Sequence, residues 1–518
     1  MIKTKKTMII IFLLTTVFLS VFSMPPHSRI MDGIRSGEIV IPDFPRTERW
    51  MAQRDYTGSY RAVVLLADFP DKNRSVDIDF FNELLNGDNV NFKQKYPGNT
   101  NVSSVKEYYL FESNDTFEID FDVYGWFEMP QDYAYYVGSN NGLGSYPNNS
   151  QKLVEDAINA ADPVVDFSRY AEGSRVDFLL VVHAGIGAEF SGASGEIWSH
   201  QWSITPQTRD GVTLSPYSMQ PEYWVEPYDM TIGVYCHELG HLIFGLRDLY
   251  DTAKNSYGIG YWGLMGAGSW NDEKSIFGEN EYSGYGGAPA ELTAWSKLRI
   301  GWEESVPVSD ETENFVVSEK IHKYENENNP QEYFLYEFKE SNPYNDYLPG
   351  RNGLMIYRID DSKYSNTQPW IPGKDMNHHY WVAVIQKDNN WSLERYENRG
   401  DPSDLFYTGD RFNQFSAPEN FFYSGDNGIP INRIETTNES ALIITNKFDF
   451  EIYIHELPGT GKLRVFLSKE PDATPSVTDS EGTPLTLHSM SGKDLFYFEL
   501  ESDSSDTTFI NNIPVSFF

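Results

Sequence analysis

The centre of the chain, residues 229–251, reads DMTIGVYCHELGHLIFGLRDLYD. Within it, His237 and His241 are four residues apart, which on a helix places both side chains on one face, one turn apart. Two imidazoles in this arrangement can bind one zinc ion, and Glu238 beside them can accept a proton from a water at the metal. The stretch therefore predicts a helix that carries a zinc site and a catalytic glutamate.

Glycine and carboxylates follow the second histidine. Gly245 can end the helix and let the backbone turn. Asp248 and Asp251 come directly after that turn, where a carboxylate can reach back to a metal held by the two histidines. Further along, residues 263–266 read GLMG and place Met265 in a tight turn between glycines. These features extend the candidate site beyond the pentapeptide.

The order of these motifs resembles one family, the immune-inhibitor-A-like secreted zinc peptidases of bacteria. DLYD at 248–251 is the most specific stretch, together with the GLMG turn, which is similar to the Met-turn of the metzincin clan. Other similar segments are AVVLLADFPD at 62–71, VVHAGIGAE at 181–189, IWSH at 197–200, ELTAWSKLRIGW at 291–302, GLMIYRID at 353–360 and GDPSDLF at 400–406. The resemblance therefore covers most of the chain.

This resemblance implies an α/β (α+β) metzincin-like zinc peptidase catalytic domain followed by β-rich C-terminal domains. It implies His237 and His241 as zinc ligands and Glu238 as the general base. The family's usual third-ligand position, ten residues after the first histidine, is Arg247 here, and a guanidinium has no lone pair to give a metal. Asp248, one position later, is therefore the candidate third ligand, with Asp251 as the alternative.

The residue that supports the oxyanion is left open by the sequence. Many metzincins place a tyrosine two residues after the Met-turn methionine, and that position is Ala267 in this chain. Three other tyrosines, Tyr250, Tyr261 and Tyr285, are close in sequence. We expect Met265 itself to pack beneath the imidazoles and not to bind the zinc.

Length and pattern predict several domains, because 518 residues exceed what one hydrophobic core usually supports. Residues 24–57 are polar and contain prolines, so we expect an N-terminal arm or a short propeptide. Residues 58–302 alternate strand and helix patterns and form the predicted catalytic domain. Residues 303–455 predict a β-rich domain packed on the catalytic domain, and residues 456–518 a small β accessory module.

Several elements of the predicted catalytic domain can be placed by their apolar patterns and end signals. The active helix is expected from about Met230 to Phe244, with Asp229 as its N-cap. Buried strands are predicted over residues 60–69 and 176–183, and helices over residues 103–111, 153–161 and 289–300.

The N-terminus predicts export. Three lysines in residues 1–6 precede an apolar run from Met8 to Phe22, which is typical of a secretory signal peptide spanning residues 1–23, with Ser23 as its last residue. The run is too short to favour a stable membrane span, so we expect a secreted, extracellular protein without stable membrane insertion. The single cysteine, Cys236, excludes an internal disulfide and is expected to be a small buried residue of the active helix.

The net charge of the chain limits the classes of partner that it can bind. With 76 acidic and 40 basic residues the formal net charge is −36, which argues against nucleic acid or anionic lipid as a partner. Protein or peptide substrates are expected instead. Asp401, Asp404 and Asp410 form a glycine-bracketed acidic loop that could bind a structural calcium ion. The module at 456–518 is faintly similar to carbohydrate-binding sandwiches, so a weak carbohydrate or surface contact is considered.

The leading hypothesis is a secreted zinc endopeptidase that hydrolyses extracellular proteins, with Glu238 as the base. One alternative is a catalytically inactive metallopeptidase-like surface binding protein, motivated by Arg247 and the one-residue insertion. Another is a zinc hydrolase of a non-peptide bond. The intact His237, Glu238 and His241 favour a working enzyme, because a decaying site would lose these residues first.

Overall fold

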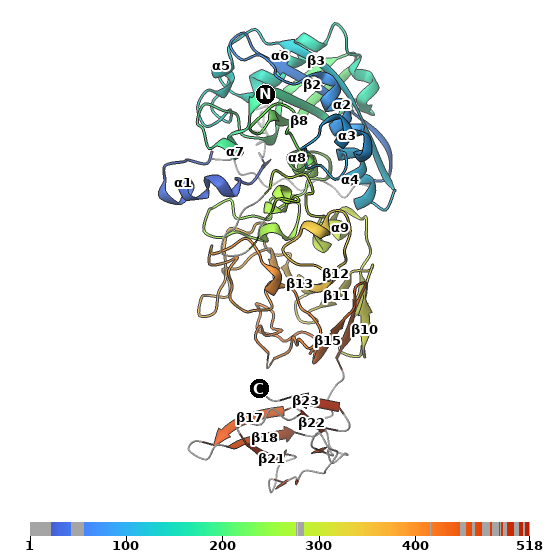
Figure 1. Cartoon of the computed structure of the whole chain (residues 1–518), viewed down its shortest axis with the longest axis vertical. Helices are drawn as coiled ribbons and strands as arrows, with labels where there is room; N and C mark the ends of the chain where they lie inside the picture. Colours follow the sequence, from blue (N-terminus) through green and yellow to red (C-terminus); the bar gives the residue numbers. More distant parts are fainter. Residues whose placement is uncertain are drawn as a thin grey trace, which may run out of the picture. The chain divides into compact units, whose positions relative to one another are not determined.

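The computed structural model describes residues 22–42, 56–275, 277, 284–414 and 416–445 and, beyond these, chiefly the strands between 452 and 516. Its largest sheet is mixed and has eight strands, with the order β1-β7-β8-β6-β2-β3 and with β5 and β4 joined through β8. Figure 1 shows β2 and β3 of this sheet side by side. β3, β2, β6 and β8 run parallel to one another, whereas β7 is antiparallel to β8. The strands are β1 (Phe22–Ser23), β2 (Gly58–Asp68), β3 (Phe117–Glu128), β4 (Ala171–Glu172), β5 (Arg175–Val176), β6 (Leu179–Ile186), β7 (His200–Arg209) and β8 (Val212–Tyr223).

Helices cover both faces of this sheet because β2 is apolar on both sides. Val63 and Leu65 belong to one buried cluster with residues of α5 and α6, whereas Val64 and Leu66 belong to another with residues of α2, α4 and α8. This period of two is what a strand buried on both faces requires. The helices are α1 (Met31–Ser36), α2 (Ile78–Asn86), α3 (Asn89–Lys95), α4 (Val105–Glu112), α5 (Tyr133–Val137), α6 (Ser150–Ala161), α7 (Ala188–Ser191), α8 (Ile232–Phe244) and α9 (Ala294–Ile300).

The active helix α8 starts later than the sequence suggested, and the predicted cap is wrong. Its N-cap is Thr231, which makes no side-chain capping bond. Asp229 instead accepts hydrogen bonds from the backbone N–H groups of Trp224, Val225 and Glu226 at 2.8–2.9 Å, so its carboxylate closes the preceding turn. The free N–H of Ile232 is satisfied from outside the helix by Asn101 Oδ1 at 3.0 Å.

The helix predicted over residues 289–300 forms only from Ala294 onward, capped by Thr293. The preceding residues are extended because their backbone pairs with the turns under the active helix. Ala290 N–H donates to Gly268 O at 2.9 Å, and Leu264 N–H donates to Glu291 O at 3.1 Å. The predicted helices at 103–111 and 153–161 correspond to α4 and α6, and the predicted strand at 60–69 corresponds to β2.

The chain from residue 306 to residue 444 forms two further sheets. A five-stranded sheet has the order β14-β13-β12-β11-β9, and a three-stranded sheet has the order β10-β16-β15. Their strands are β9 (Val306–Val308), β10 (Phe315–Val317), β11 (His322–Glu325), β12 (Glu332–Lys339), β13 (Gly353–Asp360), β14 (Val382–Val384), β15 (Arg433–Thr436) and β16 (Ala441–Ile444). Short 3-10 turns are η1 (Ser28–Ile30), η2 (Phe167–Tyr170), η3 (Gly260–Trp262), η4 (Ala267–Trp270), η5 (Asn345–Tyr347) and η6 (Pro402–Asp404).

A second compact unit contains the C-terminal strands. Two small sheets form there, with the orders β17-β18-β21-β20 and β19-β22-β23. Their strands are β17 (Ile452–Leu457), β18 (Lys462–Ser468), β19 (Val477–Thr478), β20 (His488–Ser489), β21 (Leu495–Glu501), β22 (Thr507–Ile510) and β23 (Ile513–Ser516).

The predicted signal peptide falls almost entirely outside the described residues, which begin at Phe22. Across the described part of the chain, no helix combines the length and apolar character that a membrane crossing requires. Cys236 is buried in α8, as expected.

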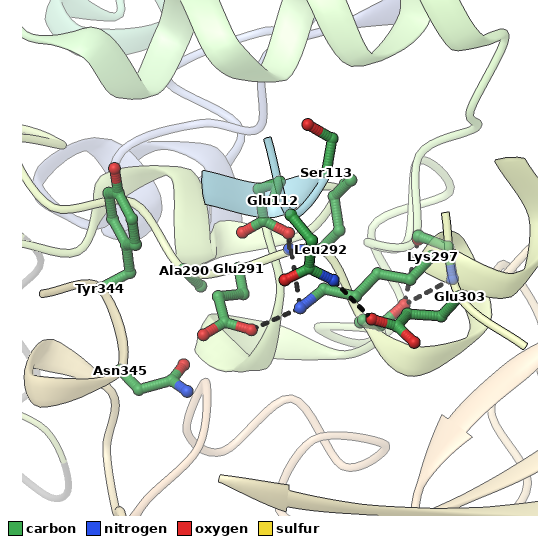
Figure 2. Close-up of polar contacts among 12 residues, drawn as sticks. Glu112, Ser113, Ala290, Glu291, Leu292, Lys297, Glu303, Tyr344 and Asn345 are labelled. Atoms are coloured by element: carbon green, nitrogen blue, oxygen red, sulfur yellow. Dashed lines mark hydrogen bonds and ion pairs between the residues drawn. The ribbon is translucent and has the colours of Figure 1, made fainter. Parts of the chain in front are cut away.

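A buried charge cluster joins α4, α9 and the extended segment before α9. Figure 2 shows Lys297 between two carboxylates: its Nζ lies 2.6 Å from Glu291 Oε2 and 3.5 Å from Glu112 Oε2. Burial raises the pKa of Glu112 to about 8, and Glu291 adds to this while Lys297 opposes it. The side chain of Asn342, which follows β12, donates to Glu291 at 2.5 Å. The cluster therefore ties the five-stranded sheet to the domain that carries α8.

Candidate metal centre and active site

Helix α8 presents both histidines to one point. His237 and His241 are buried, and their Nε2 atoms lie 3.1 Å apart. Each ring donates from Nδ1 to a backbone carbonyl: His237 to Leu264 O at 2.9 Å and His241 to Leu246 O at 2.6 Å. These bonds fix the tautomer, so both Nε2 lone pairs face the same point.

The residue inserted after His241 is absorbed by a regular last turn of α8. The helix continues to Phe244 and ends at Gly245, which has φ 64° and is therefore left-handed, a conformation that costs glycine little. Gly245 N–H donates to His241 O at 3.0 Å, and Leu246 N–H donates to Gly240 O at 3.2 Å. The chain then turns back toward the histidines.

This turn brings Asp248 to the two imidazoles. Asp248 Oδ1 lies 3.3 Å from His237 Nε2 and 3.2 Å from His241 Nε2. Burial alone would raise the pKa of Asp248, but the adjacent His241 and His237 hold it below its ordinary value.

The three atoms fit a metal ion. With both Nδ1 protons committed to carbonyls, two nitrogen lone pairs and one carboxylate oxygen converge without a proton between them, an arrangement that a cation would stabilise. Their separations of 3.1–3.3 Å are close to the edges of a tetrahedron around an ion with bonds of about 2.0–2.1 Å. Two imidazoles and a carboxylate are also a donor set that zinc favours.

The Met265 turn supports α8 from below. Gly240 faces this turn, and a Cβ on Gly240 would lie 2.7 Å from Met265 Sδ. Met265 O accepts from Leu249 N–H at 2.8 Å, which fixes the start of the segment that carries Asp248. The turn therefore orients His237 through Leu264 O and positions the Asp248 segment, and a side chain at position 240 would press on Met265.

Glu238 is buried beside this group. Neither of its carboxylate oxygens has a hydrogen-bond partner of normal geometry. Burial raises its pKa well above the ordinary carboxyl value, and the nearby Asp248 and Glu189 raise it further. The backbone N–H of Met24 acts in the opposite direction. A buried carboxyl with a raised pKa, next to a metal-type cluster, is suited to proton transfer.

Of the three tyrosines that the sequence left open, Tyr250 lies at the centre. Its hydroxyl donates at 3.0 Å to the carbonyl oxygen of Ser23, and this carbonyl lies 3.1 Å from His237 Nε2. Tyr261 instead packs edge-on against Phe277, and Tyr285 packs against Phe190. Sequence spacing alone could not separate them, because the choice depends on the turn after Gly245.

Other candidate residues lie elsewhere. Asp251 accepts hydrogen bonds from Ala253 N–H, Asn255 N–H and Ser256 Oγ at 2.7–3.0 Å and closes the following loop. Asp401 and Asp404 lie together, but their acidic neighbour is Asp388. Asp410, which the sequence grouped with them, is paired with Lys387 at 3.1 Å.

Sequence reasoning missed the closeness of the N-terminal segment to this centre. Ser23 and Met24 are buried, although the sequence predicted that the chain leaves the signal peptide at this point. Phe22 and Ser23 pair with a strand at the sheet edge about 180 residues away, and no local sequence pattern indicates such a pairing. Only the position of Ser23 at the end of the apolar run gave any signal.

A mixed α/β domain in which a buried helix carries two histidines and the turn after it carries a carboxylate is typical of metal-dependent hydrolases. Residues 57–303 match the family described as Immune inhibitor A peptidase M6, catalytic domain. The resemblance noted in the sequence is confirmed for this part of the chain.

Two relatives carry names that agree with this family. Immune inhibitor A of Bacillus thuringiensis subsp. alesti is 29% identical over 263 residues, which cover 42% of this chain and 38% of that protein. Pre-pro-metalloprotease PrtV of Vibrio cholerae serotype O1 (strain M66-2) is 29% identical over 203 residues, which cover 34% of this chain and 22% of that protein. The chain therefore spans less than half of each relative, and these comparisons support a metallopeptidase function.

Proposed function

We propose that the protein is a secreted zinc endopeptidase in which His237, His241 and Asp248 hold the zinc. The observation that carries this proposal is the convergence of two imidazole nitrogens and one carboxylate oxygen within 3.1–3.3 Å of one another. The family and the metalloprotease relatives support the peptide bond as the target. The signal-type N-terminus supports export, and extracellular proteins are the expected substrates.

When bound, zinc would polarise the scissile carbonyl and lower the pKa of a water. Glu238 takes a proton from the attacking water and delivers one to the leaving amine. Tyr250 donates its hydroxyl hydrogen to the oxygen on which negative charge develops. Leu264 O and Leu246 O hold the two imidazole rings in the tautomer that keeps both Nε2 atoms free for the metal.

Glu238→Gln tests the function most simply, because the amide keeps the shape of the side chain but cannot accept the proton. We expect the variant to keep its zinc and to lose about 10²–10⁴-fold in cleavage of an unfolded protein. Glu226→Gln, which changes an exposed glutamate upstream of α8, is the matched control and should cleave normally. Full activity in Glu238→Gln would assign the base to another residue.

The alternatives give different results in the same assay. An inactive binding scaffold would hold zinc yet leave the unfolded protein intact both in the parent and in every variant. A hydrolase of a non-peptide bond would also leave the protein intact, but it would hydrolyse a simple ester in a zinc-dependent way. Cleavage that stops with a chelator and returns with zinc excludes both.

A structural calcium site is a second part of the proposal. Carboxylate oxygens of Asp388, Asp401 and Asp404 lie within 4.8 Å of one another. Asp404 is buried, and its Oδ1 has no hydrogen-bond partner, while its Oδ2 accepts from Trp262 Nε1 at 2.9 Å. Calcium favours such oxygen ligands. Millimolar calcium should raise the melting temperature of the parent and not that of Asp404→Asn; equal shifts in both would remove this site.

A further inference from the structure

The N-terminal segment lies in the active-site cleft as an added strand. β1 pairs antiparallel with β7, with Ser23 opposite His200. Met24 N–H donates to Ser199 O at 3.3 Å, and His27 N–H donates to Glu189 O at 2.9 Å. An extended peptide that adds to a sheet edge in this way is a common mode of peptide recognition.

The segment is held by its carbonyl groups on the C-terminal side of Ser23. Trp198 Nε1 donates to Met24 O at 2.8 Å, and Trp270 Nε1 donates to Pro25 O at 2.9 Å. Arg399 donates to Pro26 O at 3.0 Å. These donors come from three separate parts of the chain, so the contact is a built site.

The side chain of Met24 is taken up as well. It is fully buried and belongs to the same apolar cluster as Met265 and α8. The ring of His27 packs at 4.8 Å from both Phe190 and Trp270, and its Nε2 donates to Gly284 O at 3.0 Å. Backbone and side chains together define how a peptide sits in this cleft.

The peptide bond between Ser23 and Met24 lies at the reacting groups. Ser23 O is 3.1 Å from His237 Nε2 and 3.0 Å from the Tyr250 hydroxyl. On the other side of the same bond, the Met24 N–H donates to Ser199 O on the neighbouring sheet edge at 3.3 Å, which fixes the direction of the peptide. A scissile carbonyl held at the metal ligands is the placement that metal-assisted peptide hydrolysis requires.

We propose that the Ser23–Met24 peptide bond is an intramolecular substrate of this centre, cut by the same protein that carries it. This inference rests on the proposed peptidase function. The oxygen of one water adds to the carbonyl carbon of Ser23 and the C–N bond breaks. The products are a carboxylate on Ser23 and an amine on Met24, and Glu238 passes the proton to that nitrogen.

The same geometry predicts which segments of other proteins this site would bind as substrates. The site takes chain in extended form, antiparallel to β7, on both sides of the bond, with Phe22 and Ser23 before it and Met24 after it. An apolar side chain is expected directly after the cleaved bond, in the place of Met24. A charge at that position would be buried without a partner and is therefore disfavoured.

The first test measures occupancy without zinc or turnover. Full-length Glu238→Gln is made in a cell-free system without export and kept in chelator, and its hydrogen–deuterium exchange is followed over residues 22–30. We expect slow exchange at Met24 and His27, whose N–H groups are bonded in the cleft. Exchange as fast as in a free peptide would overturn the proposal, whatever the catalytic function.

The second test adds zinc to the purified full-length parent and identifies new amino termini by chemical labelling and mass spectrometry. We expect a new terminus at Met24 in the parent and in Met24→Leu, none in Glu238→Gln, and formation at least tenfold slower in Met24→Asp. No exporting peptidase is present, so signal-peptide removal cannot produce this terminus.

Failure of the inference and failure of the function give different results. If Met24→Asp cleaves an added unfolded protein while the parent keeps its Ser23–Met24 bond intact, the centre is a peptidase and the self-cleavage proposal is wrong. If neither protein cuts any bond in the presence of zinc, the proposed peptidase function is wrong. The self-cleavage proposal, which rests on that function, is then wrong as well.

Discussion

Replacing Glu112 by glutamine should change how the stability of the protein depends on pH. Glu112 is buried beside Lys297, and its pKa in the folded protein is about 8, against 4.5 for an ordinary glutamate. The cause is burial, with Glu291 adding to it and Lys297 opposing it. Figure 2 shows that Lys297 keeps a second partner, Glu291, so the variant does not leave the lysine unpaired.

The upward shift of the Glu112 pKa decides whether stability rises or falls with pH. The folded state holds the Glu112 proton more tightly than the unfolded state, so its stabilising effect is complete below about pH 4.5 and is lost as pH rises to about 8. Within that window the loss is about 1.4 kcal/mol for each pH unit. From pH 5.5 to pH 7.5 the parent should therefore lose about 2 to 3 kcal/mol of unfolding free energy through this group.

Urea unfolding at the two pH values, with zinc held constant, measures this effect. The stability advantage of Glu112→Gln over the parent should grow by about 2 to 3 kcal/mol between pH 5.5 and pH 7.5, because the glutamine ionises in neither state. Glu304→Gln changes an exposed glutamate and should follow the parent at both values. A parent and Glu112→Gln that lose stability equally between the two values would refute the reasoning.

Three further predictions concern the site. Tyr250→Phe should lower kcat by about 10²-fold with little change in KM, because the hydroxyl acts on developing charge; an unchanged kcat in steady-state assays would exclude that role. Gly240→Ala should destabilise the protein by about 1–3 kcal/mol, since the new Cβ would lie 2.7 Å from Met265 Sδ; an unchanged melting temperature would contradict this. Asp248→Ala should weaken zinc binding by orders of magnitude, and Asp251→Ala should weaken it less. Competition with a chromogenic chelator measures both zinc affinities, and the reverse order would contradict this prediction.

Local patterns predicted the parts of the fold that depend on local physics. The periodic apolar run and the glycine after it predicted α8 to its last residue, Phe244, because helix ends are marked by nearby residues. The start of the same helix was placed wrongly. Asp229 has the chemistry of a cap, but three backbone donors in the preceding turn compete for it.

The errors in the remaining elements come from pairing between distant segments. Residues 289–293 contain good helix formers, yet they are extended because the turns under α8 take their backbone groups. In the same way, Asp404 lies with Asp388 rather than with Asp410, since a loop closes over it from sixteen residues away. Such choices depend on tertiary contacts that no short window contains.

The residues of the candidate site likewise divide into those that the local sequence predicted and those that depend on tertiary contacts. Spacing predicted His237, Glu238 and His241, and chemistry favoured Asp248 over Arg247; the structure brings His237, His241 and Asp248 together. The choice of Tyr250 depended on the exact path of the turn after Gly245. The occupation of the cleft by Ser23 and Met24 depended on strand pairing across most of the domain.

Metal analysis of the purified protein tests the central claim most directly. We predict one zinc per chain in the parent, bound through His237, His241 and Asp248, and a loss of most of that zinc in His241→Ala. His378→Ala, which removes an exposed histidine away from the centre, should keep it. Equal zinc in the parent and in His241→Ala, or no zinc in a folded parent after zinc is supplied, would contradict the account.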